Sequence, residues 1–416
     1  MCHLDKRPDR RGRRMTMILS RNMERLVAGS STIRKLFEEG VELAKVVGRE
    51  NVYDFSLGNP AAPVPGEVKE SIYRILEQEN SNFVHGYMLN AGYEEVREKV
   101  ASHLNLHNNT SYGKEDIIMT VGAAGGLNCL FRSILEESDE VLCFAPYFGE
   151  YRSYVMNYGG VLNVVPADFD TFQLNLKEMR QYLTPRTKAV IINNPNNPSG
   201  VIYKQEVLEE LQQILEKAEA EYGHPIYVVS DEPYRELVYD DHTLPFAPAI
   251  IKNCIIVYSF SKSLSLSGER IGYMAVGKQI DYYDILINAL VVANRCIGYI
   301  NAPSLFQLVV ADCLEVKTDV AFYDRNRKLL YETLTNLGFE CVKPEGAFYL
   351  LIKSPTADEA DFVQQAKTHN ILIVPAASFG CPGYARLAYC VSYEMIMRSL
   401  PAFEKLAADY KLGSNS

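Results

Sequence analysis

The chain has 416 residues; 47% of them are hydrophobic, 23% are charged, and the formal net charge is -10. These values are typical of a globular protein with a large core, and the negative charge argues against nucleic acid as the main partner. No apolar run approaches the roughly 18 residues that a membrane span requires, so we expect no membrane partner either.

Residues 1–17 are predicted to form a disordered basic leader. The first 14 residues contain six lysines and arginines against two aspartates, and they lack the apolar core of a secretory signal. The nine cysteines of the chain are scattered without a Cys-x-x-Cys pair, and several lie in apolar runs. We therefore expect reduced core thiols and a cytoplasmic protein.

After the leader, apolar patterns of two periodicities alternate. Helical patterns are found at 67–79, 93–105, 125–136, 204–221, 279–293 and 304–338, and strand-like runs at 117–121, 141–144, 161–165, 188–193, 226–230, 254–259 and 271–276. Such alternation predicts an α/β fold. We expect a large domain, residues 66–305, in which helices sandwich a mixed, mostly parallel sheet of seven strands.

The C-terminal part of the chain predicts a second, smaller sheet. Its expected strands are 347–352, 371–374 and 385–391, and its expected helices lie near 358–369 and 393–411. We expect a smaller α+β domain built from both chain ends, residues 18–65 and 306–416. The long helix predicted after Pro303 would be the hinge between the two domains.

Two histidines, His103 and His107, lie four residues apart on a predicted helix. No His-Glu-x-x-His pattern surrounds them, and that pattern is the usual sign of a zinc site on a helix. We therefore interpret both as solvated side chains and predict no metal site.

Small and polar residues follow several predicted strands, at the edge where open α/β sheets bind ligands. Gly122, Ala123 and Ala124 would offer backbone N–H groups to an anion at a helix N-terminus, or form a plain strand–helix turn. Phe148 suits either stacking on a flat heterocycle or ordinary core packing. Asn197 lies in a loop rich in Asn and Pro, which would hold its amide at a fixed angle unless the loop is a simple turn.

Two further strand ends carry charged residues. Asp231 follows the strand 226–230, and a carboxylate buried there needs a cationic partner. Lys262 follows the strand 254–259, where desolvation lowers the pKa of a lysine and frees its amine as a nucleophile. Arg270 and nearby hydroxyls suit a phosphate dianion. Together these residues suggest a Schiff base with a phosphorylated aldehyde, pyridoxal 5'-phosphate (PLP).

The Ser-x-x-Lys pattern that ends in Lys262 has a second interpretation. It also occurs in serine penicillin-recognising enzymes, where the serine is the nucleophile. Those enzymes carry Ser-Asp-Asn and Lys-Thr-Gly tripeptides as well, and neither occurs in this chain. The pattern therefore favours the cofactor lysine.

In combination, four motifs resemble the class I/II aminotransferases, the aspartate-aminotransferase-like group of fold-type I PLP enzymes. They are Asn-Pro-Ser-Gly at 197–200, Ser-Asp-Glu-x-Tyr at 230–234, Ser-x-Ser-Lys at 259–262 followed by Arg270, and Ala-Arg-Leu at 385–387. The resemblance covers about residues 30–410. It implies the fold-type I architecture, PLP as cofactor and a homodimer with composite active sites.

The resemblance also implies roles for the cofactor-binding residues. Lys262 would carry the Schiff base and move the proton, Asp231 would hold the pyridine nitrogen protonated, and Phe148 would stack on the ring. Asn197 and Tyr234 would hydrogen-bond the phenolic oxygen. The phosphate would be bound by Gly122, Ala123, Ala124, Ser259, Ser261, Arg270 and, from the neighbouring subunit, Tyr87. The two alanines depart from the hydroxyl residues that many relatives carry.

For the substrate, the resemblance implies that Arg386 clamps the α-carboxylate, beside Asn197 and the lid glycine Gly58. Arg295 lies near the stretch where dicarboxylate-specific relatives carry an arginine that reaches across the dimer to the distal carboxylate. The alternative for Arg295 is an ordinary surface or interface arginine.

We therefore expect a PLP-dependent aminotransferase with ping-pong kinetics, which moves an amino group between an L-amino acid and a 2-oxo acid. Aspartate and glutamate are the favoured donors. A broad or aromatic aminotransferase and a C–S β-lyase remain open, because one scaffold hosts several reactions. A PLP-binding regulatory module is disfavoured, since no helix-turn-helix precedes residue 30.

Overall fold

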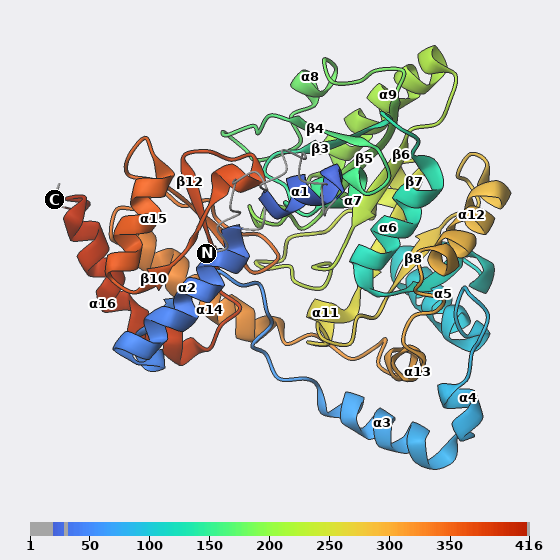
Figure 1. The fold of residues 1–416 in the computed structure, drawn as a ribbon, viewed down its shortest axis with the longest axis horizontal. Coiled ribbons are helices and arrows are strands. Elements are labelled where there is room, and N and C mark those ends of the chain that lie inside the picture. The colour runs from blue at the N-terminus through green and yellow to red at the C-terminus, as the bar shows by residue number, and fades with distance from the viewer. Residues whose placement is uncertain (1–19, 29–31, 414–416) are drawn as a thin grey trace, which may run out of the picture.

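The computed structural model describes residues 20–28 and 32–413 (Figure 1). The predicted leader, residues 1–17, lies outside the described residues. No helix within the described ranges is long and apolar enough to cross a membrane.

The central feature is a seven-stranded sheet in the order β2-β8-β7-β6-β5-β3-β4 (Figure 1). All strand pairs are parallel except those of β8, which runs antiparallel to both of its neighbours. This mixed, mostly parallel sheet confirms the predicted fold class. Its strands are β2 (Ile117–Thr120), β3 (Glu140–Phe144), β4 (Val161–Val165), β5 (Thr187–Asn193), β6 (Tyr227–Asp231), β7 (Cys254–Ser259) and β8 (Gly272–Val276).

Helices cover both faces of this sheet, because alternate strand residues point to opposite sides. In β3, Val141 and Cys143 pack into one core and Leu142 and Phe144 into another. The first core is completed by α6 (Gly122–Ile134), α7 (Tyr151–Met156) and α12 (Tyr283–Cys296). The second is completed by α8 (Leu176–Met179), α9 (Gln205–Tyr222) and α10 (Ala247–Ile250). The continuous apolar runs in the sequence reflect this burial on two faces.

A third core lies at the β2 edge of the sheet, under helices from two distant parts of the chain. α13 packs against α3, α4 and α5, which precede β2 in the sequence. The bounds are α3 (Gly66–Gln78), α4 (Ser81–His85), α5 (Glu94–Asn108), α11 (Phe260–Ser263), α13 (Ser304–Asp312) and the short 3-10 helix η2 (Lys114–Asp116).

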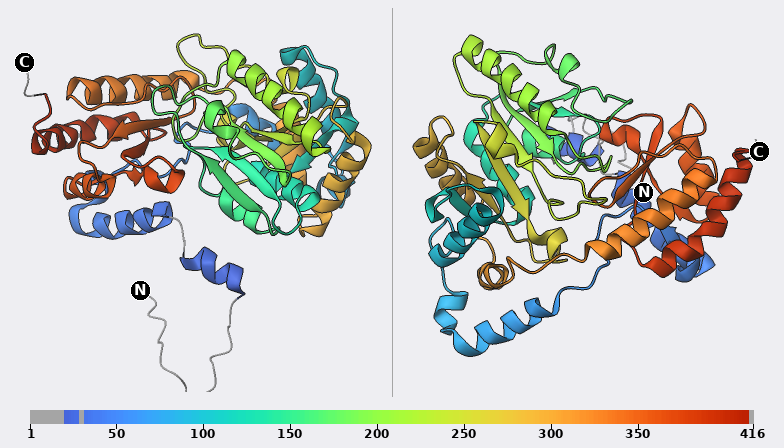
Figure 2. Two further views of the ribbon diagram at one scale, coloured as in Figure 1. Left: turned by 90° about the horizontal axis from the view of Figure 1, so that it is seen from above. Right: turned by 180° about the vertical axis from the view of Figure 1, so that it is seen from behind.

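The C-terminal residues form a separate three-stranded sheet in the antiparallel order β11-β12-β9. β10 instead pairs in parallel with β1, so the predicted strand 371–374 is divided between two sheets. The α2 helix lies beside this C-terminal unit (Figure 2). The bounds are β1 (Tyr53–Asp54), β9 (Tyr349–Lys353), β10 (Ile371–Leu372), β11 (Val374–Pro375), β12 (Tyr384–Ala388), α1 (Arg21–Ala28), α2 (Thr32–Val47), α14 (Val320–Asn336), α15 (Glu359–Thr368), α16 (Tyr393–Asp409), η1 (Arg49–Asn51) and η3 (Ala376–Phe379).

The prediction of one helix over 304–338 was wrong. The structure divides it into α13 and α14, joined by a connector at 313–319. Asp319 starts a new helix, because its side chain accepts a hydrogen bond from the backbone N–H of Phe322 at 2.9 Å. The connector residues Cys313, Leu314 and Val316 pack into the third core. In the sequence, the spacing of these apolar residues therefore looks like that of a helix that continues through the connector.

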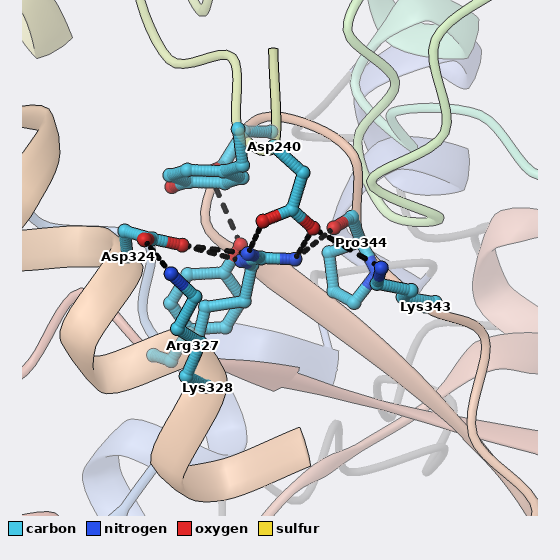
Figure 3. Close-up of polar contacts among 9 residues, drawn as sticks. Asp240, Asp324, Arg327, Lys328, Lys343 and Pro344 are labelled. Carbon is cyan, nitrogen blue, oxygen red and sulfur yellow. Dashed lines mark hydrogen bonds and ion pairs between the residues drawn. The ribbon is translucent and has the colours of Figure 1, made fainter. Parts of the chain in front are cut away.

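A buried arginine joins α14 to a loop of the seven-stranded sheet (Figure 3). Arg327 is 2% exposed, and its guanidinium donates to both carboxylate oxygens of Asp240 at 2.8 and 3.0 Å and to Pro344 O at 3.0 Å. It also donates to Asp324 on its own helix at 2.7 and 2.8 Å. These hydrogen bonds lower the pKa of Asp240 to about 2, so its carboxylate stays ionised in any ordinary buffer.

We expect Arg327→Met to lower the free energy of unfolding by about 3 kcal/mol, since it leaves the Asp240 and Asp324 carboxylates without their shared cation. Urea unfolding followed by circular dichroism measures the loss. Lys328→Ala is the matched control on the same helix: Lys328 also pairs with Asp324, but its side chain is 53% exposed. The control should change stability by less than about 1 kcal/mol. Equal losses in both variants would contradict a specific role for the buried arginine.

Candidate active site

A cavity of about 300 Å³ opens at the carboxyl ends of β5, β6 and β7, beside the start of α6. Parallel strands bring their carboxyl ends to one edge of a sheet, which explains why residues distant in the sequence meet here. The predicted site residues that line the cavity are Gly58, Ala123, Ala124, Phe148, Asn197, Asp231, Tyr234, Ser259, Ser261, Lys262, Arg270 and Arg386. Leu127, Tyr154, Asn193, Pro233, Ser267 and Tyr349 complete the lining.

Lys262 lies in α11, directly after β7, and its ammonium donates to Gly58 O at 2.6 Å. Desolvation lowers the pKa of Lys262 to about 8, and the positive charges of Arg270 and Arg386 act in the same direction. A much larger fraction of this lysine is therefore a free amine near neutral pH than of a solvated lysine. The Lys262 Nζ also lies 5.2 Å from the centre of the Phe348 ring.

Asp231 is the last residue of β6 and is buried. Its Oδ2 accepts a hydrogen bond from the Tyr151 hydroxyl at 2.5 Å, whereas its Oδ1 is buried without a partner. Burial raises the pKa of Asp231 to about 7, opposed by the Tyr151 hydrogen bond. A carboxylate in this state requires a cation or a positively charged N–H group on its free oxygen.

Tyr151 was not predicted as a site residue. Tyr151 is the first residue of α7 and is buried, and its hydroxyl orients the Asp231 carboxylate through this hydrogen bond. The sequence contains 27 tyrosines, and no local motif distinguishes this one. Tyr151 reaches Asp231, 80 positions away in the sequence, only because α7 packs on the sheet.

Arg386 is a fully buried cation on β12. Its guanidinium donates to Ser56 O at 2.6 Å and to Asn197 Oδ1 at 3.4 Å, while its Nε has no partner among the described residues. The guanidinium lies 4.7 Å from the centre of the Tyr349 ring and 4.9 Å from that of Phe379. A desolvated guanidinium with an unused donor is a strong site for a carboxylate.

A hydrogen-bond chain connects Arg386 to the middle of the cavity. Asn197 Nδ2 donates to the Tyr234 hydroxyl at 3.4 Å, and that hydroxyl lies 3.0 Å from the hydroxyl of Tyr349. Asn193 accepts from the backbone N–H of Asn197 at 2.7 Å and so holds the loop in place. Tyr349 was missed by the sequence analysis, because it is 115 residues from Tyr234.

The start of α6 forms an anion-binding corner with Arg270. Gly122, the first residue of α6, has φ of 65°, and a Cβ there would lie 3.0 Å from Arg270 Nη2. Both observations require glycine at this position. The helix N-terminus carries the positive end of its dipole, and Arg270 adds a full charge. The hydroxyls of Ser259 and Ser261, which also line the cavity, lie 2.7 Å apart.

Two side walls complete the cavity. Phe148 packs edge-on against Tyr151, with ring centres 5.6 Å apart and an angle of 84°. Gly58 faces the Tyr349 hydroxyl so closely that a Cβ would overlap it. The Gly58 carbonyl accepts the hydrogen bond from Lys262.

Apart from Gly122, which lies beside Arg270 as described above, two predicted site residues do not line the cavity of this chain. Tyr87 is 93% exposed, and Arg295, in the last turn of α12, is exposed as well. Both were predicted to act on the active site of a neighbouring subunit. Their roles therefore stay predictions.

The donor set fits PLP group by group. The unpartnered Oδ1 of Asp231 suits a protonated pyridine nitrogen, and the α6 corner with Arg270 suits the phosphate. The depressed pKa of Lys262 suits attachment of an aldehyde, and Arg386 suits a substrate carboxylate. The fold and the cavity together define a fold-type I enzyme for PLP chemistry on amino acids.

Comparison with known proteins agrees with this class. Residues 50–403 match the family model "Aminotransferase class I and II". A crystal structure of an aminotransferase from Eubacterium rectale superposes with a TM-score of 0.92 at 43% identity, over 95% of this chain and 100% of that one. The aspartate/prephenate aminotransferase of Thermus thermophilus is 31% identical, over 91% of this chain and 95% of the relative. The aromatic-amino-acid aminotransferase 2 of Thermococcus litoralis is 30% identical, over 95% and 100%.

The chain belongs to the class I and II aminotransferase family. It is a PLP-dependent aminotransferase, as the sequence analysis predicted. Its substrates are amino acids and 2-oxo acids.

Proposed function

We propose that this aminotransferase takes aspartate as its preferred amino donor and passes the amino group to a 2-oxo acid. The observation that carries the proposal is the buried Arg386, which has an unpartnered Nε and lines the same cavity as Lys262 and Asp231. Arg386 accounts for the α-carboxylate that all such substrates share. The names of several relatives, including the one from Thermus thermophilus, support aspartate as the donor.

When bound, PLP supplies an electron sink for the electrons of the substrate Cα–H bond. Asp231 would keep this sink effective by accepting the N–H of the ring, and Tyr151 holds the orientation of the Asp231 carboxylate. Asn197 and Tyr234 would donate to the phenolic oxygen of the ring. Together the contacts from Asp231, Asn197 and Tyr234 would orient the ring.

Lys262 has two tasks. Its amine would hold the cofactor between turnovers, and once the substrate is bound the same amine would take the proton from the substrate Cα and give it back on the cofactor side. The pKa of about 8 suits both tasks, because a group that takes and returns a proton works best near the operating pH. Arg386 holds the substrate carboxylate and so keeps the Cα–H bond beside Lys262.

Selection of aspartate requires a second cation for its distal carboxylate. Among the described residues that line the cavity, the positive side chains are Lys262, Arg270 and Arg386, and each already has a task. We therefore propose that Arg295 from a second copy of the chain provides the second cation. Exposed apolar side chains near it support a subunit interface: Tyr87, Leu89 and Ile300 are 93%, 64% and 37% exposed. A hydrogen bond of 3.1 Å from Asn90 Nδ2 to Ile300 O joins the two segments that carry them.

An aromatic amino donor is the second candidate. The cavity walls contain Phe148, Tyr154, Tyr234 and Tyr349, and these rings would pack well against a phenyl or indole side chain. The relative from Thermococcus litoralis bears the name of an aromatic aminotransferase. A C–S β-lyase remains the third, since the same residues would support elimination.

A panel of amino donors with 2-oxoglutarate as acceptor separates the candidates. Highest kcat/KM for aspartate supports the proposal, whereas highest values for phenylalanine or tyrosine support the aromatic alternative. Release of pyruvate from cysteine-type substrates without any 2-oxo acid identifies a lyase.

We place the enzyme in the cytoplasm, supported by the buried free thiols of Cys129, Cys143 and Cys254.

Arg295→Ala tests the specificity directly. We expect kcat/KM for aspartate to fall roughly 30-fold, because a buried carboxylate left unpaired costs about 2 kcal/mol, while values for alanine and phenylalanine stay nearly constant. Arg180→Ala is the control, since Arg180 is a half-exposed arginine that pairs with Glu210 on the surface. Equal losses for all donors would rule out Arg295 as the selector.

Sedimentation should give two chains per particle, because the proposed site needs Arg295 from a second chain and a monomer cannot supply it.

A further inference from the structure

A group of three potential metal ligands lies outside the active site. His103 and His107 lie one turn apart on α5, and Glu315 reaches them from the connector at 313–319. His103 Nδ1 lies 2.6 Å from Glu315 Oε1, and His107 Nε2 lies 3.2 Å from Glu315 Oε2. The three donor atoms lie within 4.8 Å of one another. Within residues 20–28 and 32–413, this is the one such group of His, Cys, Asp and Glu.

The helix and the connector determine this geometry. Residues four apart on a helix share one face, so both imidazoles point to the same side of α5, with ring centres 4.5 Å apart. The connector is held on that side because Leu314 and Val316 pack into the third core. Thr318 also donates to Ser263 O at 3.0 Å. The apolar packing and the Thr318 hydrogen bond fix the backbone around Glu315, so its carboxylate stays close to the two imidazoles.

The chemistry of the three ligands identifies the class of ion. Two neutral imidazoles and one carboxylate bind divalent transition metals such as Zn²⁺ or Co²⁺ with about 2.0–2.2 Å bonds, and leave a fourth position for water. Calcium and magnesium require a set of oxygen ligands instead. The side chains of His103, His107 and Glu315 are 25%, 50% and 64% exposed, so an ion can enter from solvent.

We propose that His103, His107 and Glu315 form a divalent transition-metal site that links α5 to the connector between α13 and α14. The sequence analysis predicted no metal site, because it considered only the two histidines and the residues beside them. The third ligand is 208 residues from His107. The connector also contacts α11, the helix that contains Lys262, through the hydrogen bond from Thr318 to Ser263 O. The ion therefore stabilises a segment that packs against the helix of Lys262.

The test is a Co²⁺ titration of the tag-free holoenzyme, followed by calorimetry and by visible absorption. We expect one ion per chain and a d–d spectrum without a thiolate charge-transfer band, which excludes the exposed Cys296 as the ligand. His103→Ala and Glu315→Gln should each weaken binding more than tenfold, because each removes a ligand. Co²⁺ should raise the melting temperature of the wild type by mass action, and the variants should not respond.

His369→Ala is the matched control. His369 Nε2 lies 2.6 Å from Asp409 Oδ2, but that pair has no third ligand, so the control should bind Co²⁺ as the wild type does. None of these residues touches the active-site cavity, so transamination without added metal should stay unchanged in all three variants. Absence of stoichiometric binding, or binding that His103→Ala and Glu315→Gln leave intact, overturns the proposal and identifies the cluster as a His–Glu ion pair only.

Discussion

Lys262→Ala should reduce transamination at least about 10⁴-fold, because it removes the proposed attachment point of the cofactor and the group proposed to move the proton. Single-turnover kinetics with aspartate measures the loss. In the wild type, borohydride reduction followed by peptide mass spectrometry should place the cofactor on the peptide that contains Lys262. The variant should show no labelled peptide.

Lys278→Ala is the control for this substitution. Lys278 is 58% exposed and pairs with Glu115 on the surface, far from the lining of the cavity. It should keep near-normal turnover and the same labelled peptide. Near-normal turnover in Lys262→Ala, or a label on another lysine, would contradict the proposed role. The pKa of about 8 adds a second readout: cofactor uptake by the apoprotein should accelerate as the pH rises through 8.

Asp231→Asn should lower kcat about 10³-fold, since it removes the charge proposed to keep the ring nitrogen protonated. The same substitution should stabilise the cofactor-free protein at neutral pH. The pKa of Asp231 is raised to about 7 in the fold, against about 3.9 in an unfolded chain. The folded state therefore favours the protonated carboxyl, and its stability falls as the pH rises from about 4 to about 7. Asparagine does not titrate and avoids this loss.

Thermal unfolding of the cofactor-free protein at pH 5 and at pH 8 measures this second effect. The gain from Asp231→Asn should be larger at pH 8 than at pH 5. Asp361→Asn, which changes an exposed carboxylate in the first turn of α15, should show no such difference. A gain that does not depend on pH would show that the Asp231 carboxylate is not held in a desolvated site. An active Asp231→Asn enzyme would contradict its role toward the ring.

The prediction from sequence succeeded where the information is local. Each strand of the central sheet is buried on both faces, so its apolar run stands out in the sequence, and the seven runs became β2 to β8. Lys262 and Asp231 were predicted as site residues because each lies at or just after the end of such a run, and both line the cavity. The parallel arrangement then necessarily brings these two ends to one edge of the sheet.

Other features depend on contacts between distant residues, and the sequence gives no sign of them. The hydrogen bonds between Tyr151 and Asp231 and between Tyr349 and Tyr234 form only when the helices and sheets pack together. The break between α13 and α14 was not predicted, because the connector contains buried apolar side chains at the spacing expected of a helix. Glu315 becomes a partner of two histidines only because that connector folds back onto α5. Local periodicity therefore determined the elements and the chemistry at their ends, whereas tertiary packing decided which side chains orient that chemistry.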